Sequence, residues 1–239
     1  MSSQRIALVT GAGRGLGREI ALALADATAG VAVHYLSRKN SAEETARMVR
    51  NKGKLSAALR ADLTKESEAA ALVRGVERKF GRLDILVNNV GPILMKPWIE
   101  LTAGDWIRIF RANLLSSFSC LKAALPGMRT RKWGRIINIG YSRAEQLAAF
   151  PTITAYAAAK TSLLILTRTA AAAEAGSGVT VNMVSPGLLE GGVLPPGLKA
   201  DKRTMGTFAD VAAAVCYLTS DKAGAVTGTD LIVAGAWKM

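Results

Sequence analysis

A tyrosine and a lysine four residues apart, Tyr156 and Lys160, form a pair suited to acid–base chemistry. They lie in a segment with helical periodicity, so both side chains share one helix face and their ends can approach one another. A nearby ammonium group stabilises a phenolate and lowers the tyrosine pKa from about 10 toward neutrality. Tyr156 is therefore a candidate to donate a proton to a carbonyl oxygen as hydride arrives, or to remove one in reverse. Because such a pair is common by chance, other motifs must support it.

A glycine-rich turn, TGAGRGLG at 10–17, follows an expected strand and opens an expected helix. Glycines let the backbone turn tightly and approach a pyrophosphate, whose charge is stabilised by free N–H groups at the helix N-terminus. The motif predicts a dinucleotide site. The cofactor-binding positions expected in it are Gly11, Arg14, Gly15, Leu16 and Gly17.

The end of the second expected strand reads HYLSRK at 34–39 and contains no acid. An acidic residue there would bind the adenosine ribose 2′-hydroxyl and repel a 2′-phosphate. Arg38 and Arg14 instead offer cationic donors to a phosphate, and Ser37 offers a hydroxyl. The sequence thus favours NADP(H); the alternative is that Arg38 and Lys39 form only a solvated turn.

Short apolar runs alternate with longer helical segments, and the runs are near-continuous, as in parallel strands buried on both faces. This pattern predicts an α/β fold: one doubly wound, Rossmann-type parallel sheet of about seven strands with helices on both faces, in a single dinucleotide-binding domain over 1–239. The expected strands are Arg5–Thr10, Gly30–Leu36, Leu55–Arg60, Leu83–Asn88, Arg135–Ile139, Val179–Val184 and Asp230–Val233. The expected helices are Leu16–Ala27, Ser41–Lys52, Lys65–Phe80, Gly104–Leu125, Thr154–Ala175 and Phe208–Thr219.

Composition excludes several classes of protein. The 31 Lys and Arg residues exceed the 18 Asp and Glu residues, giving a net charge of +13 that attracts anions without identifying them. The basic residues are spread out and no nucleic-acid motif accompanies them, so nucleic-acid binding is disfavoured. Two distant cysteines and one histidine provide neither a disulfide framework nor a metal site, which favours a reducing, cytoplasmic compartment. Neither a run of eighteen apolar residues nor a signal peptide is present, so no membrane association is expected.

Taken together, the motifs resemble the short-chain dehydrogenase/reductase family over essentially the whole chain. They are TGAGRGLG at 10–17, Asp62-Leu63, NNVG at 88–91, Asn113, YAAAK at 156–160 and SPG at 185–187. Within that family the sequence is most similar to bacterial 3-oxoacyl-(acyl-carrier-protein) reductases, with some likeness to pteridine reductases. The resemblance implies a Rossmann-type sheet of order 3-2-1-4-5-6-7 and hydride transfer to or from a nicotinamide cofactor.

The resemblance also implies roles for single residues. Tyr156 would be the general acid/base, Lys160 would lower its pKa and hold the nicotinamide ribose, and Asn113 would hold a water in the proton relay. Subunits of this family commonly pack at the C-terminal edge, so a homo-oligomer, a dimer or a tetramer, is expected. The further cofactor positions implied are Asp62 and Leu63 beside the adenine, Asn88 along the adenosine ribose, Gly91 of NNVG, and Pro186, Gly187 and Leu189 beside the nicotinamide.

Three departures from the family pattern bear on the carbonyl-polarising serine, on the substrate and on the subunit interface. The family serine that polarises the carbonyl follows the strand ending at Ile139; counting back from the tyrosine reaches Arg143, whereas matching the strand end reaches Tyr141, beside Ser142. Ser142 is the catalytic candidate and Tyr141 the alternative. The expected substrate loop, 187–207, is short, and its LPPGL at 194–198 is similar to the pteridine-reductase loop. The family's Asp-Gly-Gly is replaced by AGA at 234–236.

Three functions are compatible with the sequence. The first is an NADPH-dependent carbonyl reductase acting on a 3-oxoacyl thioester or another ketone; a basic surface would suit an acidic acyl-carrier protein by steering. The second is a pteridine-reductase-like enzyme. The third is a non-catalytic, NADP-binding regulatory protein of the same fold, a hypothesis motivated by the missing serine.

Overall fold

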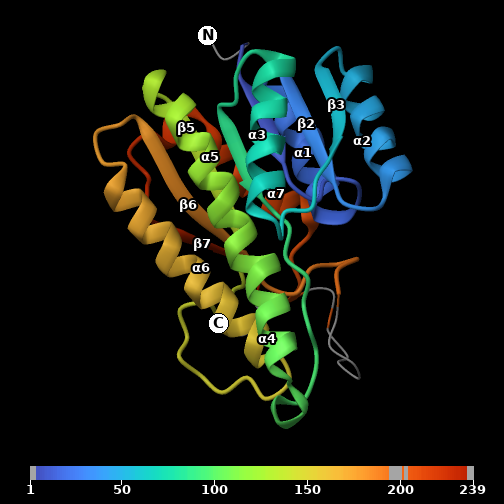
Figure 1. The fold of residues 1–239 in the computed structure, drawn as a ribbon, viewed down its shortest axis with the longest axis vertical. Coiled ribbons are helices and arrows are strands. Elements are labelled where there is room, and N and C mark those ends of the chain that lie inside the picture. The colour runs from blue at the N-terminus through green and yellow to red at the C-terminus, as the bar shows by residue number, and fades with distance from the viewer. Residues whose placement is uncertain (1–3, 194–200, 202–203, 236–239) are drawn as a thin grey trace.

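A parallel seven-stranded sheet forms the centre of the molecule in the computed structural model, which describes residues 4–193, 201 and 204–235 (Figure 1). Its strand order is β3-β2-β1-β4-β5-β6-β7. This order confirms the predicted fold class, and each predicted strand is present within a few residues of its expected bounds. The strands are β1 (Ile6–Val9), β2 (Gly30–Tyr35), β3 (Leu55–Arg60), β4 (Ile85–Asn88), β5 (Gly134–Ile139), β6 (Val179–Pro186) and β7 (Asp230–Val233).

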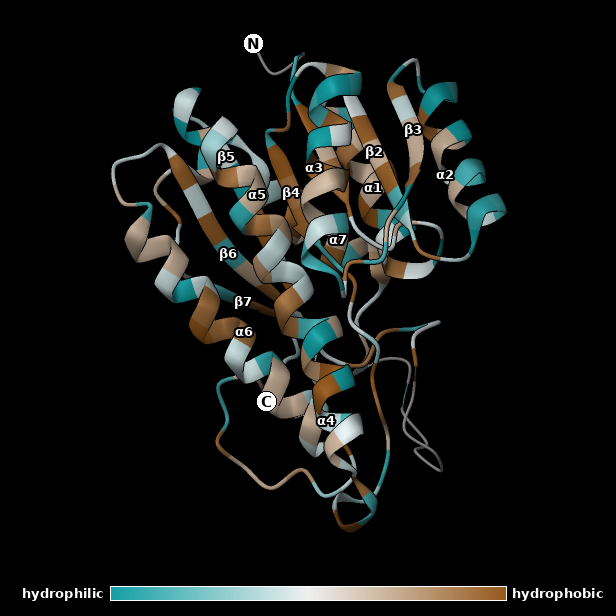
Figure 2. Cartoon of the chain, in the orientation of Figure 1, coloured by the Kyte–Doolittle hydropathy of each residue, from teal (hydrophilic) through white to brown (hydrophobic). Residues whose placement is uncertain are grey.

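Helices cover both faces of the sheet. One layer holds α1 (Gly15–Ala27), α2 (Lys39–Asn51) and α7 (Phe208–Thr219), and the other holds α3 (Glu66–Phe80), α5 (Ser116–Thr130) and α6 (Thr154–Ala173). Alternate strand residues enter opposite cores: Ala7 and Val9 pack on the first layer, Ile6 and Leu8 on the second. The central strands are mostly apolar because both of their faces are buried, as the brown colouring of β2 and β4 shows (Figure 2). The edge strand β3 is only partly buried, and β5 and β6 contain buried polar side chains such as Asn138 and Asn182.

The segment predicted as one helix over 104–125 is more complex. Helix α4 (Ala103–Phe110) begins at a capping box between Thr102 and Asp105, continues through a π-helical turn at Arg111–Leu115, and leads into α5. A π turn widens the helix by one residue per turn and often occurs at functional sites. Hydrophobic periodicity does not reveal it, because it leaves the amphipathic pattern nearly unchanged.

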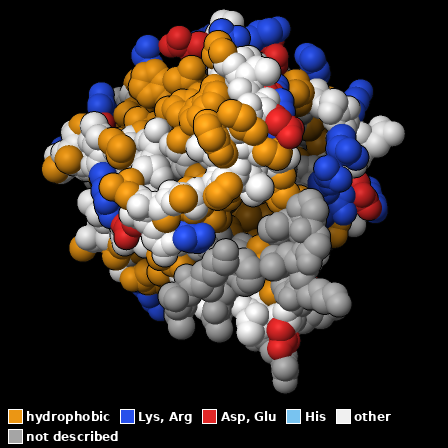
Figure 3. Space-filling model, turned by 90° about the horizontal axis from the view of Figure 1, so that it is seen from below, with side chains coloured by type: hydrophobic (Ala, Val, Ile, Leu, Met, Phe, Trp, Pro, Cys, Tyr) orange, Lys and Arg blue, Asp and Glu red, His pale blue; other side chains and the backbone are white. Residues whose placement is uncertain are grey.

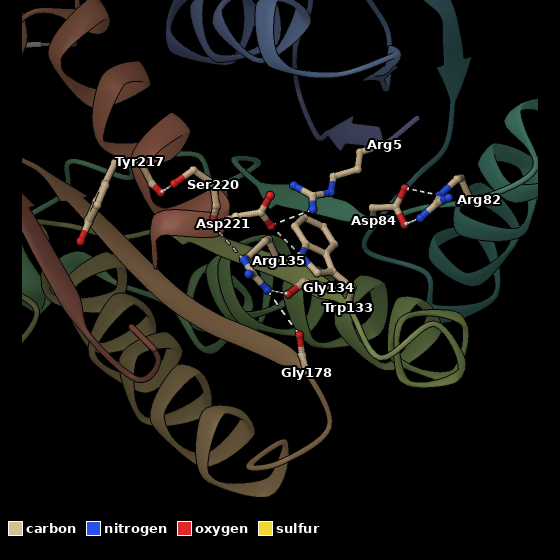
Figure 4. Close-up of polar contacts among 10 residues, drawn as sticks. All are labelled: Arg5, Arg82, Asp84, Trp133, Gly134, Arg135, Gly178, Tyr217, Ser220 and Asp221. Atoms are coloured by element: carbon tan, nitrogen blue, oxygen red, sulfur yellow. Dashed lines mark hydrogen bonds and ion pairs between the residues drawn. The ribbon is translucent and has the colours of Figure 1, made fainter. Parts of the chain in front are cut away.

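A polar cluster closes the amino edge of the sheet, opposite the loops described below (Figure 4). The Arg5 guanidinium lies 3.7 Å from the centre of the Trp133 ring, and the Arg135 guanidinium lies 4.4 Å from it. Asp221 accepts hydrogen bonds from Arg5 at 2.7 Å and from the Trp133 indole at 3.2 Å. These contacts fasten β1, β5 and the short helix Asp221–Ala223 together, so this group of charges has a structural explanation.

Three further observations concern the cysteines, clusters of possible metal ligands and membrane-spanning helices. Cys120 and Cys216 are both free thiols. Within the described ranges, no group of three or more His, Cys, Asp or Glu side chains is placed to hold a metal ion. None of the helices in those ranges is long and apolar enough to cross a lipid bilayer.

Candidate active site

An open cleft of about 1160 Å³ lies at the carboxyl edge of the sheet, where the loops after β1, β4, β5 and β6 meet. Figure 3 views this edge: hydrophobic side chains surround a hollowed centre, and Lys and Arg side chains gather on the side of α2. The cleft wall contains four cationic residues and, among the described residues, no Asp or Glu. The four are Arg14, Lys96, Arg143 and Lys160.

The glycine turn forms one wall of this cleft. Gly11 and Gly15 have φ values of +65° and +54°, which side chains rarely tolerate. A Cβ on Gly17 would lie 2.6 Å from both the Asn89 side-chain nitrogen and the Gly11 oxygen. No side chain caps the N-terminus of α1, so the first N–H groups of this helix have no capping partner. This cradle fits the pyrophosphate of a dinucleotide.

A buried histidine fastens the glycine turn to the sheet, and sequence reasoning did not assign it a role. His34 on β2 accepts a hydrogen bond from the Gly11 N–H at Nδ1 (3.0 Å), while its Nε2 lies 3.1 Å from the Ala61 carbonyl. The neutral tautomer with hydrogen on Nε2 satisfies both bonds, and burial lowers the pKa of His34, which favours this form. A histidine at the end of an otherwise apolar strand was the available signal.

Tyr156 and Lys160 lie one turn apart on α6, both at the cleft. The Lys160 ammonium nitrogen donates a hydrogen bond to the Ile139 carbonyl at 2.7 Å and lies 5.7 Å from the centre of the Tyr156 ring. Burial lowers the pKa of Lys160 to about 7 and raises the pKa of Tyr156. In the protein alone, the pKa of Tyr156 therefore shifts opposite to the direction expected from the sequence, because burial dominates and Lys160 itself loses charge near neutrality.

Asn113 lies in the π turn, directly behind Gly91. Its side-chain nitrogen donates to the Pro92 and Ile109 carbonyls, both at 3.1 Å. Its side-chain oxygen is buried and has no hydrogen-bond partner among the described residues. A Cβ on Gly91 would lie 2.4 Å from that oxygen and 2.9 Å from the Lys160 nitrogen. Asn113 thus presents an unused acceptor beside Lys160, the arrangement that a bound water needs.

The structure separates the two candidates for the carbonyl-polarising position. The Ser142 N–H donates to the Pro186 carbonyl at 3.0 Å, and its hydroxyl is buried without a partner in the described chain and does not line the cleft. Tyr141 does line it, with its ring centre 5.8 Å from that of Tyr156 in an edge-to-face arrangement. Ser142 is thus bonded to β6 behind the cleft wall, whereas Tyr141 lies in the cleft beside Tyr156.

The remaining predicted residues divide into two groups. Those that line the cleft are Gly11, Arg14, Gly15, Leu16, Gly17, Gly91, Tyr156, Lys160, Pro186, Gly187 and Leu189. Those outside the lining are Ser37, Arg38, Asp62, Leu63 and Asn88, besides Asn113 and Ser142. Asn88 is buried and donates to the Asn138 side chain at 2.9 Å, which gives it a role inside the sheet. Asp62 accepts hydrogen bonds from Thr64, and these lower its pKa.

Only part of the expected substrate loop can be placed. Leu189 bridges to Gly206, and Gly191, Gly192 and Val193 line the cleft. The LPPGL segment at 194–198 and residues 199, 200, 202 and 203 lie outside the described residues, as do Ala236 and Trp237. Three further residues that line the cleft were not assigned a role from the sequence: Asn89, Lys96 and Phe150. Asn89 belongs to the NNVG motif, whereas Lys96 and Phe150 lie in loops without a recognisable pattern.

Comparisons with known proteins agree on the family. Residues 5–196 match the model of the short chain dehydrogenase family. The chain is 35% identical to the 3-oxoacyl-[acyl-carrier-protein] reductase FabG of Staphylococcus aureus (strain Mu50), over 100% of both chains. It is 34% identical to the D-beta-hydroxybutyrate dehydrogenase of Rhizobium meliloti (strain 1021), over 98% of both.

Solved structures lead to the same family. A blue fluorescent protein from a metagenomic library, in complex with NADPH, superposes with a TM-score of 0.91 at 32% identity over 99% of both chains. The acetoin dehydrogenase of Enterobacter cloacae superposes with a TM-score of 0.88 at 29% identity, over 98% of this chain and 95% of that one. With this fold, this cleft and these relatives, the chain belongs to the short-chain dehydrogenase/reductase family and is an oxidoreductase.

Proposed function

We propose that this protein is an NADPH-dependent reductase that converts a carbonyl group to an alcohol. The observation that carries the proposal is that Tyr156 and Lys160 line one cleft with the glycine cradle, while the side-chain oxygen of Asn113 lies directly behind the cleft wall, near Lys160. A 3-oxoacyl thioester, as in the name of the Staphylococcus relative, is one substrate class; another ketone is the alternative. The pteridine-reductase-like reading depends on the 194–198 segment and gains no support from the described residues.

The residues present fit a dinucleotide. The glycine turn depends on the left-handed φ of Gly11 and Gly15 and on close packing at Gly17, where a Cβ would lie 2.6 Å from the Gly11 oxygen. The uncapped N-terminus of α1 beside this turn suits a pyrophosphate. When bound, the nicotinamide cofactor supplies the hydride that reduces the carbonyl carbon. NADPH is favoured over NADH because Arg14 and Arg38 are exposed and form no ion pair with any described carboxylate, and no acid ends β2.

The protein's own residues would manage the proton. Tyr156 donates its phenolic proton to the carbonyl oxygen, and Tyr141, whose hydroxyl is the nearest alternative to the absent serine, orients that oxygen. Lys160 in its charged form stabilises the phenolate that results. The free oxygen of Asn113 holds a water from which Tyr156 recovers its proton.

The test is NADPH and NADH oxidation with an acetoacetyl thioester, a dihydropteridine and a reactive diketone as substrates. Tyr156→Phe should lower turnover about 10²- to 10⁴-fold while leaving NADPH binding nearly intact, because only the proton donor is lost. Unchanged turnover in Tyr156→Phe would refute the mechanism. Tight NADPH binding with no reduction of any substrate would instead favour the non-catalytic, regulatory alternative.

A homo-oligomer is part of this proposal. Exposed apolar side chains lie on the adjacent α4–α5–α6 surface: Ile107, Leu115, Phe118 and Ile165. Large apolar side chains exposed on neighbouring helices are typical of a subunit interface. Light scattering should give a mass of two or four chains, and Ile165→Lys should reduce it; the mass of a single chain in the wild type would contradict the proposal.

A further inference from the structure

Arg143 is a half-buried cation in the cleft whose charge is not neutralised. Its Nε donates to the Gln146 side-chain oxygen at 2.5 Å, and its guanidinium lies 4.9 Å from the centre of the Phe150 ring. The guanidinium also forms a side-chain hydrogen bond with Tyr141. All three partners are neutral, and none of the described carboxylates forms an ion pair with Arg143. They hold the guanidinium against the cleft wall and leave its positive charge open to an anionic ligand.

The other cations of the cleft already have partners or assigned roles. The Lys96 ammonium pairs with Asp105 at 2.8 Å. The Lys160 nitrogen donates to the Ile139 carbonyl, and Arg14 lies on the glycine turn where a pyrophosphate would bind. Among the described residues that line the cleft, Arg143 is therefore the cation that the cofactor and the catalytic pair do not use. A cation in a cleft whose described lining contains no acid attracts an anionic ligand group.

A row of aromatic rings connects Arg143 with Tyr156. The Tyr141 ring lies between them: its centre is 5.8 Å from that of Tyr156 and 6.1 Å from that of Phe150, over which Arg143 lies. Both ring pairs are edge-to-face, so the three rings form one continuous aromatic wall. A ligand along this wall can place its carbonyl at Tyr156 and an anionic group at Arg143.

We propose that the substrate is an oxo acid, whose carboxylate Arg143 binds while its carbonyl lies at Tyr156. Carboxylate fits because a guanidinium binds it through parallel N–H···O bonds. This inference rests on the proposed function. A C–H bond forms at the carbonyl carbon with hydride from NADPH, which is oxidised to NADP⁺. The C=O π bond breaks, and its oxygen takes the Tyr156 proton. The product is the corresponding hydroxy acid, with its carboxylate unchanged.

The experiment compares acids with their neutral esters. Initial rates of NADPH oxidation are measured with 3-oxobutanoate, 4-oxopentanoate and 5-oxohexanoate, each beside its methyl ester, which has the same reacting carbonyl. In the wild type, at the chain length that fits, the acid should exceed its ester about 10- to 100-fold in kcat/KM. Arg143→Gln should abolish this preference, mainly by raising the KM of the acid.

Arg74→Gln is the matched control, because Arg74 is an exposed arginine on α3 and its loss changes the net charge equally. It should keep the preference for the acid. The inference is overturned if the wild type treats acid and ester alike, or if Arg143→Gln keeps the preference. A thermal melt of Arg143→Gln establishes that the variant is folded.

Direct binding separates this inference from the proposed function. Calorimetric titration of the protein with each acid and ester should show the same Arg143-dependent selectivity without any turnover. Selective binding with no NADPH-dependent reduction would refute the proposed function and support the anion site. Reduction of neutral ketones with no selective binding would support the function and overturn the anion site.

Discussion

Replacing Gly91 by alanine tests whether the arrangement of Asn113 and Lys160 sustains turnover. The φ of Gly91 is not in the left-handed region, so the backbone tolerates alanine and only the new methyl group matters. That Cβ would lie 2.4 Å from the Asn113 oxygen and 2.9 Å from the Lys160 nitrogen, whereas ordinary contact begins at 3.4 Å. The Asn113 amide must therefore move by about 1 Å and the Lys160 ammonium by about 0.5 Å.

A displacement of about 1 Å in a positioning group can lower a rate about 10²-fold. Moving the amide also weakens its bonds to the Pro92 and Ile109 carbonyls, each contributing about 1 kcal/mol to stability. For a domain of this size, 1 kcal/mol corresponds to about 2–4 °C in the unfolding midpoint. We expect Gly91→Ala to lose about 99% of kcat and to unfold only a few degrees lower.

Steady-state kinetics with the best substrate of the panel, together with a thermal melt, measures both effects. Gly75→Ala on α3 is the matched control: a Cβ there meets nothing within 4 Å, so activity should be unchanged and stability equal or higher. If Gly91→Ala kept more than about half of the wild-type kcat, the Asn113–Lys160 arrangement would not serve the reaction, and the reasoning would be wrong.

Three other substitutions probe single interactions. Arg38→Asp should shift the kcat/KM ratio from NADPH toward NADH, since it places an acid where the 2′-phosphate would lie; an undiminished NADPH preference would make Arg38 a solvated turn. Burial raises the pKa of Asp230, whose oxygens make no well-formed hydrogen bond with described residues, so stability falls as pH rises through that pKa. Asp230→Asn should raise the melting temperature at pH about 8 more than at pH about 4. Burial lowers the pKa of His34 below 6.5, so the stability it contributes is present above that pH and lost below it; melts of His34→Gln should show a flatter profile between pH about 7 and 5.

The basic character of the chain does not by itself indicate a nucleic-acid partner. Several arginines are engaged in structural contacts, such as Arg129 with the buried Glu174, and Arg82 and Arg131 with the buried Asp84. At the amino edge, Arg5 and Arg135 enclose Trp133. Four further cations line the cleft: Arg14, Lys96, Arg143 and Lys160. Much of the basic character is thus explained by the fold and by the cleft, without a nucleic-acid partner.

Local patterns in the sequence determined the fold and much of the candidate site. Uninterrupted apolar strands require burial on both faces, which leads to a parallel sheet between helices, and helix geometry alone brings Tyr156 beside Lys160. The strand-turn-helix context located the glycine cradle. These features depend on residues close in sequence, whose periodicity and spacing are read directly; the cofactor roles assigned to them remain predictions.

Tertiary structure decided what depends on contacts between distant segments. Asn113 lies in a π turn and meets Gly91 and Lys160, which belong to other segments, and His34 on β2 reaches the glycine turn that follows the neighbouring strand β1. Tyr141 lines the cleft and Ser142 does not, although the two are adjacent in sequence. The pKa directions of Tyr156 and Lys160 follow from burial. Local patterns do not fix these features, because burial and side-chain direction arise only when the packed segments come together.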